Sequence, residues 1–248
     1  MCNHKYEKYM ELTPKKRSEL VKRGAKKISV PGDIVTKDHI EAYKKSQVLN
    51  EFLNEYINKI TEGFEKTDIE INNEIKTIFD NFIDTFIRDI DAKLSSPKPS
   101  SYTIADTPAL SLANTFTRSL STKLGEVWEK IACISPKVVS PDIDFGIKIK
   151  GVDVIILLDG NLTYTQIKTM KGTLTGSQVT RSISELKLHD HSLFVGALDL
   201  GTWTFSSEDI TRQTGEEFWS RIDLDYSEIH KLAGNVMKKL EESFNTRL

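Results

Sequence analysis

An aspartate, a glutamine and a lysine lie on what the sequence predicts to be two neighbouring β-strands. Asp153 opens an apolar, β-branched run, and Gln166 and Lys168 belong to a second run. Between the two runs, the Asp-Gly-Asn segment at 159–161 is typical of a hairpin turn. A carboxylate in an apolar strand is costly if it is buried without a partner, so Asp153 is expected to have one.

The turn decides which residue faces Asp153. If residues 160–161 form the turn, Asp153 lies opposite Lys168, and if residues 159–160 form it, Asp153 lies opposite Gln166. Both registers place the three side chains on one face, because strand side chains alternate with period two. A carboxylate, an amide oxygen and an ammonium at one spot suit Mg²⁺-assisted phosphodiester hydrolysis, since Mg²⁺ takes oxygen ligands and a lysine can orient the attacking water. A structural Asp–Lys pair, with Gln166 uninvolved, explains the same pattern.

This hairpin resembles the PD-(D/E)XK nuclease motif and, more narrowly, that of type II restriction endonucleases. The resemblance rests on Gly151-Val152-Asp153 at the first strand and on Tyr164-Thr165-Gln166-Ile167-Lys168 on the second. It implies that Asp153 and residue 166 hold Mg²⁺ and that Lys168 serves the water. Gln166 stands where Glu or Asp is usual in the family, which removes one negative charge from the expected metal site.

A helix predicted over residues 108–133 carries a second part of the resemblance. The segment 125–132, Gly-Glu-Val-Trp-Glu-Lys-Ile-Ala, is similar to a family pattern with a glutamate on the helix before the hairpin. Glu129 occupies the matching place, so the resemblance implies that it is a further catalytic residue and metal ligand. Glu126 stays open as the alternative, because the two glutamates flank the apolar stripe of the helix from opposite sides.

A second aspartate competes with Asp153 for the metal. Pro141-Asp142 is a literal Pro-Asp dipeptide upstream of the hairpin. Asp142 precedes the strand in a Ser-Pro context, where aspartate commonly caps a helix or turns the chain. We therefore favour Asp153 and keep Asp142 as the alternative.

The periodicity of the second half predicts an α/β fold with a PD-(D/E)XK restriction-endonuclease-like core. A mixed sheet around the 147–169 hairpin is expected to be flanked by helices at 108–133 and 176–188. Residues 192–200 read as another buried strand and residues 202–205 alternate after it, while 215–222 and 226–244 read as closing helices.

The first half reads as helical. Apolar residues recur at helical spacing from 48 to 94 with a break near 61–67, which predicts two helices folded back on each other. Two prolines among small polar residues at 95–101 predict a linker. We therefore expect a helical N-terminal region, residues 1–100, for DNA contacts or dimerisation, and a nuclease core, residues 101–248.

Several polar residues are candidates for DNA contacts. Lys171, Gln178 and Arg181 follow the second strand, and Lys22 and Arg23 belong to a basic N-terminal cluster. Arginine and glutamine are types that read guanine and adenine edges, and basic clusters bind phosphates in a salt-sensitive way. Ordinary surface solvation explains each of these residues equally well.

The composition bounds the class of protein. The 248 residues carry a formal net charge of −2, so the chain as a whole is not a basic nucleic-acid coat. Two cysteines are too few for a disulfide framework, the five histidines show no zinc spacing, and no apolar run could span a bilayer. We expect a cytoplasmic protein without a secretory signal and without a membrane partner.

Taken with the resemblance, these features predict a type II restriction endonuclease, a Mg²⁺-dependent enzyme that cuts double-stranded DNA at specific sites and acts as a homodimer. Two alternatives stay open. One is a repair or junction-resolving nuclease of the same superfamily. The other is a non-catalytic DNA-binding protein on the same fold, which Gln166 favours.

Overall fold

The computed structural model describes residues 6–96 and 107–248, and their contacts divide them into two compact units. The sheet unit takes the described residues up to Glu65 together with Ala132–Leu224, and the helical unit takes Lys66–Ile131 and Asp225–Leu248. This division differs from the expected boundary after residue 100, because the chain leaves the sheet unit at Glu65 and returns at Ala132. From residue 97 on, the predicted linker lies outside the described residues.

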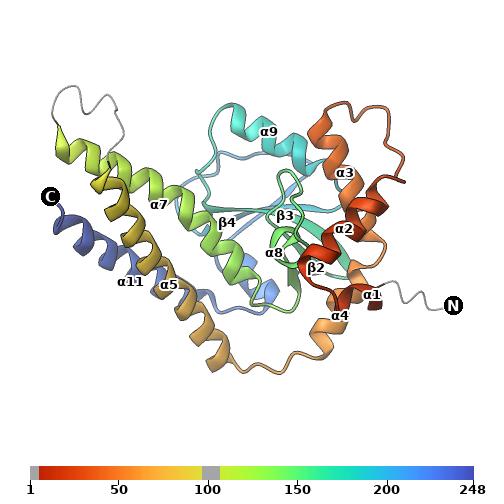
Figure 1. The fold of residues 1–248 in the computed structure, drawn as a ribbon, viewed down its shortest axis with the longest axis horizontal. Helices are drawn as coiled ribbons and strands as arrows, with labels where there is room; N and C mark the ends of the chain where they lie inside the picture. The colour runs from red at the N-terminus through yellow and green to blue at the C-terminus, as the bar shows by residue number, and fades with distance from the viewer. Residues whose placement is uncertain (1–5, 97–106) are drawn as a thin grey trace. The chain divides into compact units, whose positions relative to one another are not determined.

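The sheet unit contains a five-stranded mixed sheet in the order β1-β2-β3-β4-β5, of which β2, β3 and β4 are labelled in Figure 1. Its first two pairings are antiparallel and its last two are parallel. The strands are β1 (Val138–Val139), β2 (Val154–Leu158), β3 (Asn161–Met170), β4 (Ser192–Leu198) and β5 (Thr211–Thr214). The expected α/β class with a mixed sheet flanked by helices is confirmed.

The turn between β2 and β3 resolves the open question of register. Asp159 and Gly160 both have positive φ, 50° and 79°, as a two-residue type I′ turn requires. Leu158 then pairs with Asn161, and Val154 pairs with Thr165. Continued by one position, this register sets Asp153 opposite Gln166.

One face of the sheet unit's hairpin is covered by helices from the N-terminal part of the chain. The buried cluster there joins Leu49, Phe52 and Ile57 to Ile155 and Tyr164. The helices of this unit are α1 (Glu7–Met10), α2 (Pro14–Ala25), α3 (Lys37–Asn50), α4 (Leu53–Glu62), α8 (Pro141–Phe145), α9 (Ser177–Leu186), α10 (Glu216–Trp219) and a 3₁₀ turn (Ser220–Ile222). The apolar residues that precede the break near 61–67 in the sequence therefore pack into the core of the sheet unit.

The expected first strand begins too early at residue 147. Just before that position, residues 141–145 form α8, because Ser140 accepts a hydrogen bond from the Ile143 backbone N–H at 3.2 Å and Pro141 occupies the first helical position. Beyond that helix, Ile149 and Val152 form only an isolated bridge, and β2 begins at Val154.

Residues 202–205 alternate like a strand but lie outside the sheet. The Phe205 ring stacks on that of Phe194 with centroids 4.0 Å apart, and Trp203 contacts Phe194 edge-on at 6.2 Å. Aromatic packing rather than strand pairing therefore explains the alternation. The last strand is the polar segment β5, which the apolar pattern did not predict.

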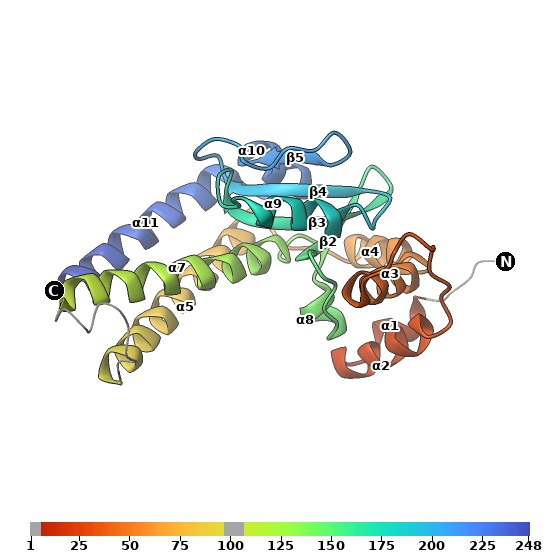
Figure 2. The same ribbon diagram turned by 90° about the horizontal axis from the view of Figure 1, so that it is seen from above.

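The helical unit consists of α5 (Asp68–Ser95), α7 (Pro108–Ala132) and α11 (Tyr226–Asn245), which lie side by side in both views (Figure 2). Phe116 of α7 joins all three, because its ring lies 4.8 Å from that of Phe86 on α5 and 5.3 Å from that of Phe244 on α11. The apolar residues that follow the break near 61–67 thus pack in the helical unit. The residues before and after the break therefore belong to different cores. In the described part of the chain, no helix combines the length and apolar character needed to cross a bilayer.

Candidate active site

Asp153 and Lys168 meet at the end of the β2–β3 hairpin away from the turn. The Asp153 backbone N–H donates to the Thr165 carbonyl at 2.9 Å, which holds this residue directly beyond the last pair of the two strands, Val154 and Thr165. Its Oδ2 lies 3.7 Å from Nζ of Lys168. The period-two alternation thus places a carboxylate and an ammonium of neighbouring strands within ion-pair distance.

The Asp153 carboxylate also has a structural partner. Its Oδ2 accepts a hydrogen bond from the Ile167 backbone N–H at 2.8 Å, which satisfies a donor where the ladder with β2 ends. The side chain nevertheless stays one-third exposed, at 33%. The carboxylate is therefore held in place by the sheet while part of it remains accessible to a ligand.

Gln166 is buried between the sheet and α9. Its Oε1 accepts a hydrogen bond from the Ser182 hydroxyl of α9. The amide oxygen keeps a second lone pair, so this contact orients Gln166 without exhausting its acceptor capacity. The sequence analysis did not identify Ser182, because only the crossing of α9 over β3 brings the two residues together.

A second carboxylate that the sequence analysis missed lies on the same helix. Glu185 is buried, with its side chain 4% exposed, and its Oε1 lies 3.5 Å from Nε of Arg181. Beside it, Gly151 adopts φ +76°, and a Cβ at that position would lie 2.6 Å from Oε2 of Glu185. In the sequence, Glu185 follows Ser182 by three positions, a spacing that places both residues on one face of α9. This spacing could have identified Glu185 as a neighbour of Ser182.

Two positions before Gln166 on β3, Tyr164 forms a buried aromatic pair with His189. Their rings stack 4.0 Å apart, and the Tyr164 hydroxyl donates to Asn50 Oδ1 at 2.7 Å. Burial raises the pKa of Tyr164 and lowers the pKa of His189 to about 3. Neither ring nitrogen of His189 has a hydrogen-bond partner among the described residues. At neutral pH this imidazole is uncharged and packs as an aromatic ring.

The predicted glutamates and the alternative aspartate belong to other helices. Glu129 and its alternative Glu126 are on α7, in the helical unit, whereas Asp153 belongs to the sheet unit. Asp142 is the second residue of α8 and pairs with the exposed Lys148 at 3.3 Å. Their predicted roles at the metal stay predictions.

The predicted DNA-contact residues differ in their surroundings. Lys171 pairs with Asp199 at 2.7 Å and is only 20% exposed, whereas Arg181 is 67% exposed on α9. Gln178 is exposed near the start of that helix, where its Oε1 accepts from the Thr175 N–H at 3.3 Å. Lys22 and Arg23 are exposed on the last turn of α2. Arg181 and Gln178 thus lie on α9, the helix whose Ser182 contacts Gln166.

The donor set around Asp153 is of the kind that a hard divalent cation uses. Carboxylate oxygens of Asp153 and the amide oxygen of Gln166 match Mg²⁺ chemistry, and no thiolate is among them. Across residues 6–96 and 107–248, no three His, Cys, Asp or Glu side chains group as ligands for a metal ion. A cation bound by Asp153 and Gln166 would take its remaining ligands from water and phosphate oxygens.

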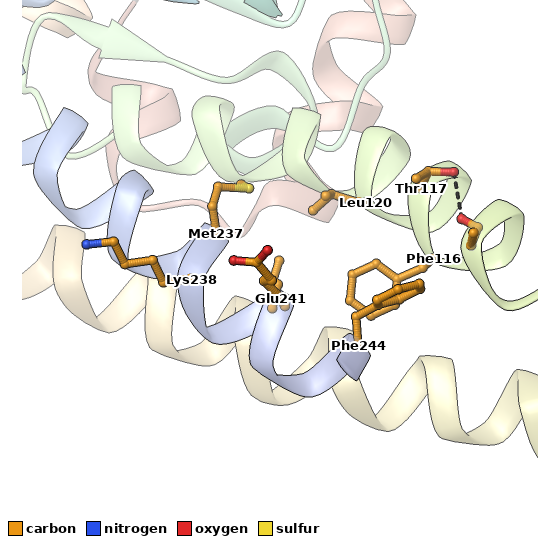
Figure 3. A pocket seen from close by; sticks show the side chains of 9 residues that line it. Phe116, Thr117, Leu120, Met237, Lys238, Glu241 and Phe244 are labelled. Atoms are coloured by element: carbon orange, nitrogen blue, oxygen red, sulfur yellow. Dashed lines mark hydrogen bonds between the residues drawn. The ribbon is translucent and has the colours of Figure 1, made fainter. Parts of the chain in front are cut away.

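The helical unit contains an apolar groove of about 420 Å³ between α7 and α11 (Figure 3). Phe116 and Leu120 of α7 face Met237 and Phe244 of α11 across it, with Lys238 and Glu241 nearby. None of the predicted catalytic residues lines it. Its walls offer apolar contact rather than acid–base chemistry.

Comparison with known proteins gives no assignment. The sequence matches no protein-family model, and no curated protein matches it significantly. The resemblance to PD-(D/E)XK restriction endonucleases therefore stays a prediction.

Proposed function

We propose that this protein is a Mg²⁺-dependent endonuclease with a PD-(D/E)XK-like core that cuts double-stranded DNA at specific sites, as type II restriction endonucleases do. The observation that carries the proposal is the Asp153–Lys168 pair, whose charged atoms lie 3.7 Å apart where Asp153 directly precedes β2 and Lys168 lies on β3, partly accessible from solvent. An aspartate and a lysine paired at the end of a hairpin supply two groups that metal-dependent hydrolysis needs. The aspartate can bind the cation, and the lysine can orient the attacking water.

The residues divide the chemistry between them. Asp153 and Gln166 would hold the cation, with Glu129 as the predicted additional ligand. Bound Mg²⁺ would supply Lewis-acid polarisation of the phosphate and lower the pKa of the attacking water. Lys168 would hold that water by hydrogen bonding and offset negative charge at the scissile phosphate. Ser182 would keep the Gln166 oxygen in a fixed orientation.

The DNA would lie across α9. The exposed Arg181 and Gln178 are of the types that form bidentate contacts with guanine and adenine. Lys22 and Arg23 on α2 would bind phosphates without reading sequence. A homodimer would supply two such sites for the two strands of a two-fold symmetric target.

The test is cleavage of unmethylated phage DNA by the purified full-length protein, with Mg²⁺ and with an EDTA control. Discrete bands that require Mg²⁺ would support site-specific cleavage, and mapping their ends would give the sequence. A smear would contradict sequence specificity, and preferential cutting of branched substrates would support the repair alternative.

The contact between Gln166 and Ser182 favours a second candidate function. It buries a neutral amide where a catalytic carboxylate would be expected and engages its oxygen within the protein. A DNA-binding protein without catalysis on the same fold would need no more than this. Salt-sensitive DNA binding with intact DNA in Mg²⁺ and Mn²⁺ would favour this function over cleavage.

A further inference from the structure

Glu185 is a buried carboxylate with a weakly placed counter-charge. Its side chain is 4% exposed, while the Arg181 side chain that approaches it at 3.5 Å is 67% exposed. Taking a carboxylate out of water is costly unless strong partners compensate it. An arginine that lies mostly in solvent compensates only in part, so the position favours binding of a further positive charge.

The surroundings of Glu185 are those of the candidate active site. Ser182, three residues earlier and on the same face of α9, holds Gln166. Glu185 itself lies against Gly151, two residues before Asp153, closely enough that only a glycine fits. Helix α9 therefore brings the Glu185 carboxylate to the segment that carries Asp153, while Ser182 of the same helix contacts the side chain that replaces the usual acid.

We propose that Glu185 is the second carboxylate of the cation site, supplying from α9 the charge that Gln166 lacks on β3. This assignment rests on the proposed function and places the ligand in the sheet unit, in contrast to Glu129 in the helical unit. Arg181 balances Glu185 in the cation-free protein. When a divalent cation binds Glu185, it neutralises the carboxylate in place of Arg181. The exposed Arg181 guanidinium is then free to contact a DNA phosphate.

The test measures Mn²⁺ binding to the full-length protein without DNA, by titration calorimetry, so that the result does not depend on cleavage. Glu185→Gln keeps the shape of the side chain and removes its charge, and we expect about tenfold weaker Mn²⁺ binding or more. Adding Gln166→Glu to this variant should recover most of the loss. Glu19→Gln, at an exposed position on α2, is the control and should bind within about twofold of the unaltered protein. Glu129→Gln tests the predicted ligand on α7.

Arg181→Gln provides an independent measurement. Removing the competing positive charge should tighten Mn²⁺ binding by about threefold and weaken DNA binding. Circular dichroism establishes that each variant is folded. If Glu185→Gln does not fold, Arg181→Gln decides, and unchanged Mn²⁺ affinity in that variant overturns the assignment.

The outcomes separate this inference from the function on which it rests. Unchanged binding by Glu185→Gln, with binding lost in Asp153→Asn, would leave the cation site in place and remove Glu185 from it. A loss with Glu129→Gln instead would return the role to α7. Absence of Mn²⁺ binding by the unaltered protein would overturn both the inference and the metal-dependent function.

Discussion

Gly151 and Glu185 are packed so closely that a methyl group at position 151 would lie 2.6 Å from the Glu185 Oε2 atom and closer still to its Cβ. Gly151 also has φ +76°, a backbone conformation that residues other than glycine rarely adopt. Two independent constraints thus require glycine two residues before the candidate catalytic aspartate, Asp153.

Gly151→Ala should therefore destabilise the sheet unit by about 2 kcal/mol or more, since it combines backbone strain with displacement of a buried carboxylate. The measurement is urea unfolding followed by circular dichroism. Gly160→Ala is the matched comparison, because it has a similar φ of 79° but no atom within 4 Å of the added methyl group. Equal losses in the two variants would show that the contact with Glu185 contributes nothing.

Lys168→Ala should lower the DNA cleavage rate by about 100-fold or more, because it removes the group proposed to orient the water. DNA affinity should change only a few-fold. Lys59→Ala, which removes an exposed lysine paired with Glu62 on α4, serves as the control and should cleave normally. Full cleavage by Lys168→Ala would refute the proposed mechanism.

Burial of His189 makes stability depend on pH. Its pKa is about 3 in the folded protein and about 6.5 when unfolded, so between these values the unfolded chain binds a proton that the folded protein does not. The contribution of this residue to stability is complete above about pH 6.5 and falls by about 1.4 kcal/mol per pH unit as the pH drops toward 3.

His189→Phe keeps a ring against Tyr164 and should reduce this loss. Urea unfolding at pH 7 and pH 5 should give a smaller difference for this variant than for the unaltered protein. His230→Gln, at an exposed position on α11, should leave the difference unchanged. An unaltered pH dependence in His189→Phe would show that the imidazole is not the titrating group.

Lys22 and Arg23 should act on DNA through phosphates alone. Replacing both with alanine should weaken binding to all sequences alike and reduce the slope of log affinity against log salt by up to about two. Fluorescence anisotropy with two unrelated duplexes at several salt concentrations measures both effects. An unchanged slope would exclude α2 from the DNA-binding surface.

The sequence predicted the local features of the hairpin well. The Asp-Gly turn signal and the period-two alternation were sufficient to bring Asp153 and Lys168 to one face. They left two registers open, and the positive φ of Asp159 decides between them. Nothing local distinguishes that conformation from one that turns a single residue later.

The contacts of α9 and the grouping of the helices could not be predicted in this way. Periodicity gives the buried face of a helix but not the strand that it crosses. The sequence therefore did not reveal that Ser182 contacts Gln166 or that Glu185 packs against Gly151. In the same manner, the break near residues 61–67 marks where one helix ends and another begins. It carries no information that α4 and α5 serve different cores.

Each compact unit is assembled from two separate stretches of chain, and this affects how the protein folds during synthesis. The hydroxyl partners of Tyr164 at Ser46 and Asn50 lie 118 and 114 positions earlier in the chain. The apolar faces of α3 and α4 therefore leave the ribosome long before β3 exists to cover them. Such non-local contacts slow folding, and the apolar surface of the nascent N-terminal helices stays exposed until β3 is synthesised. These helices are therefore the part of the chain where a chaperone would be needed.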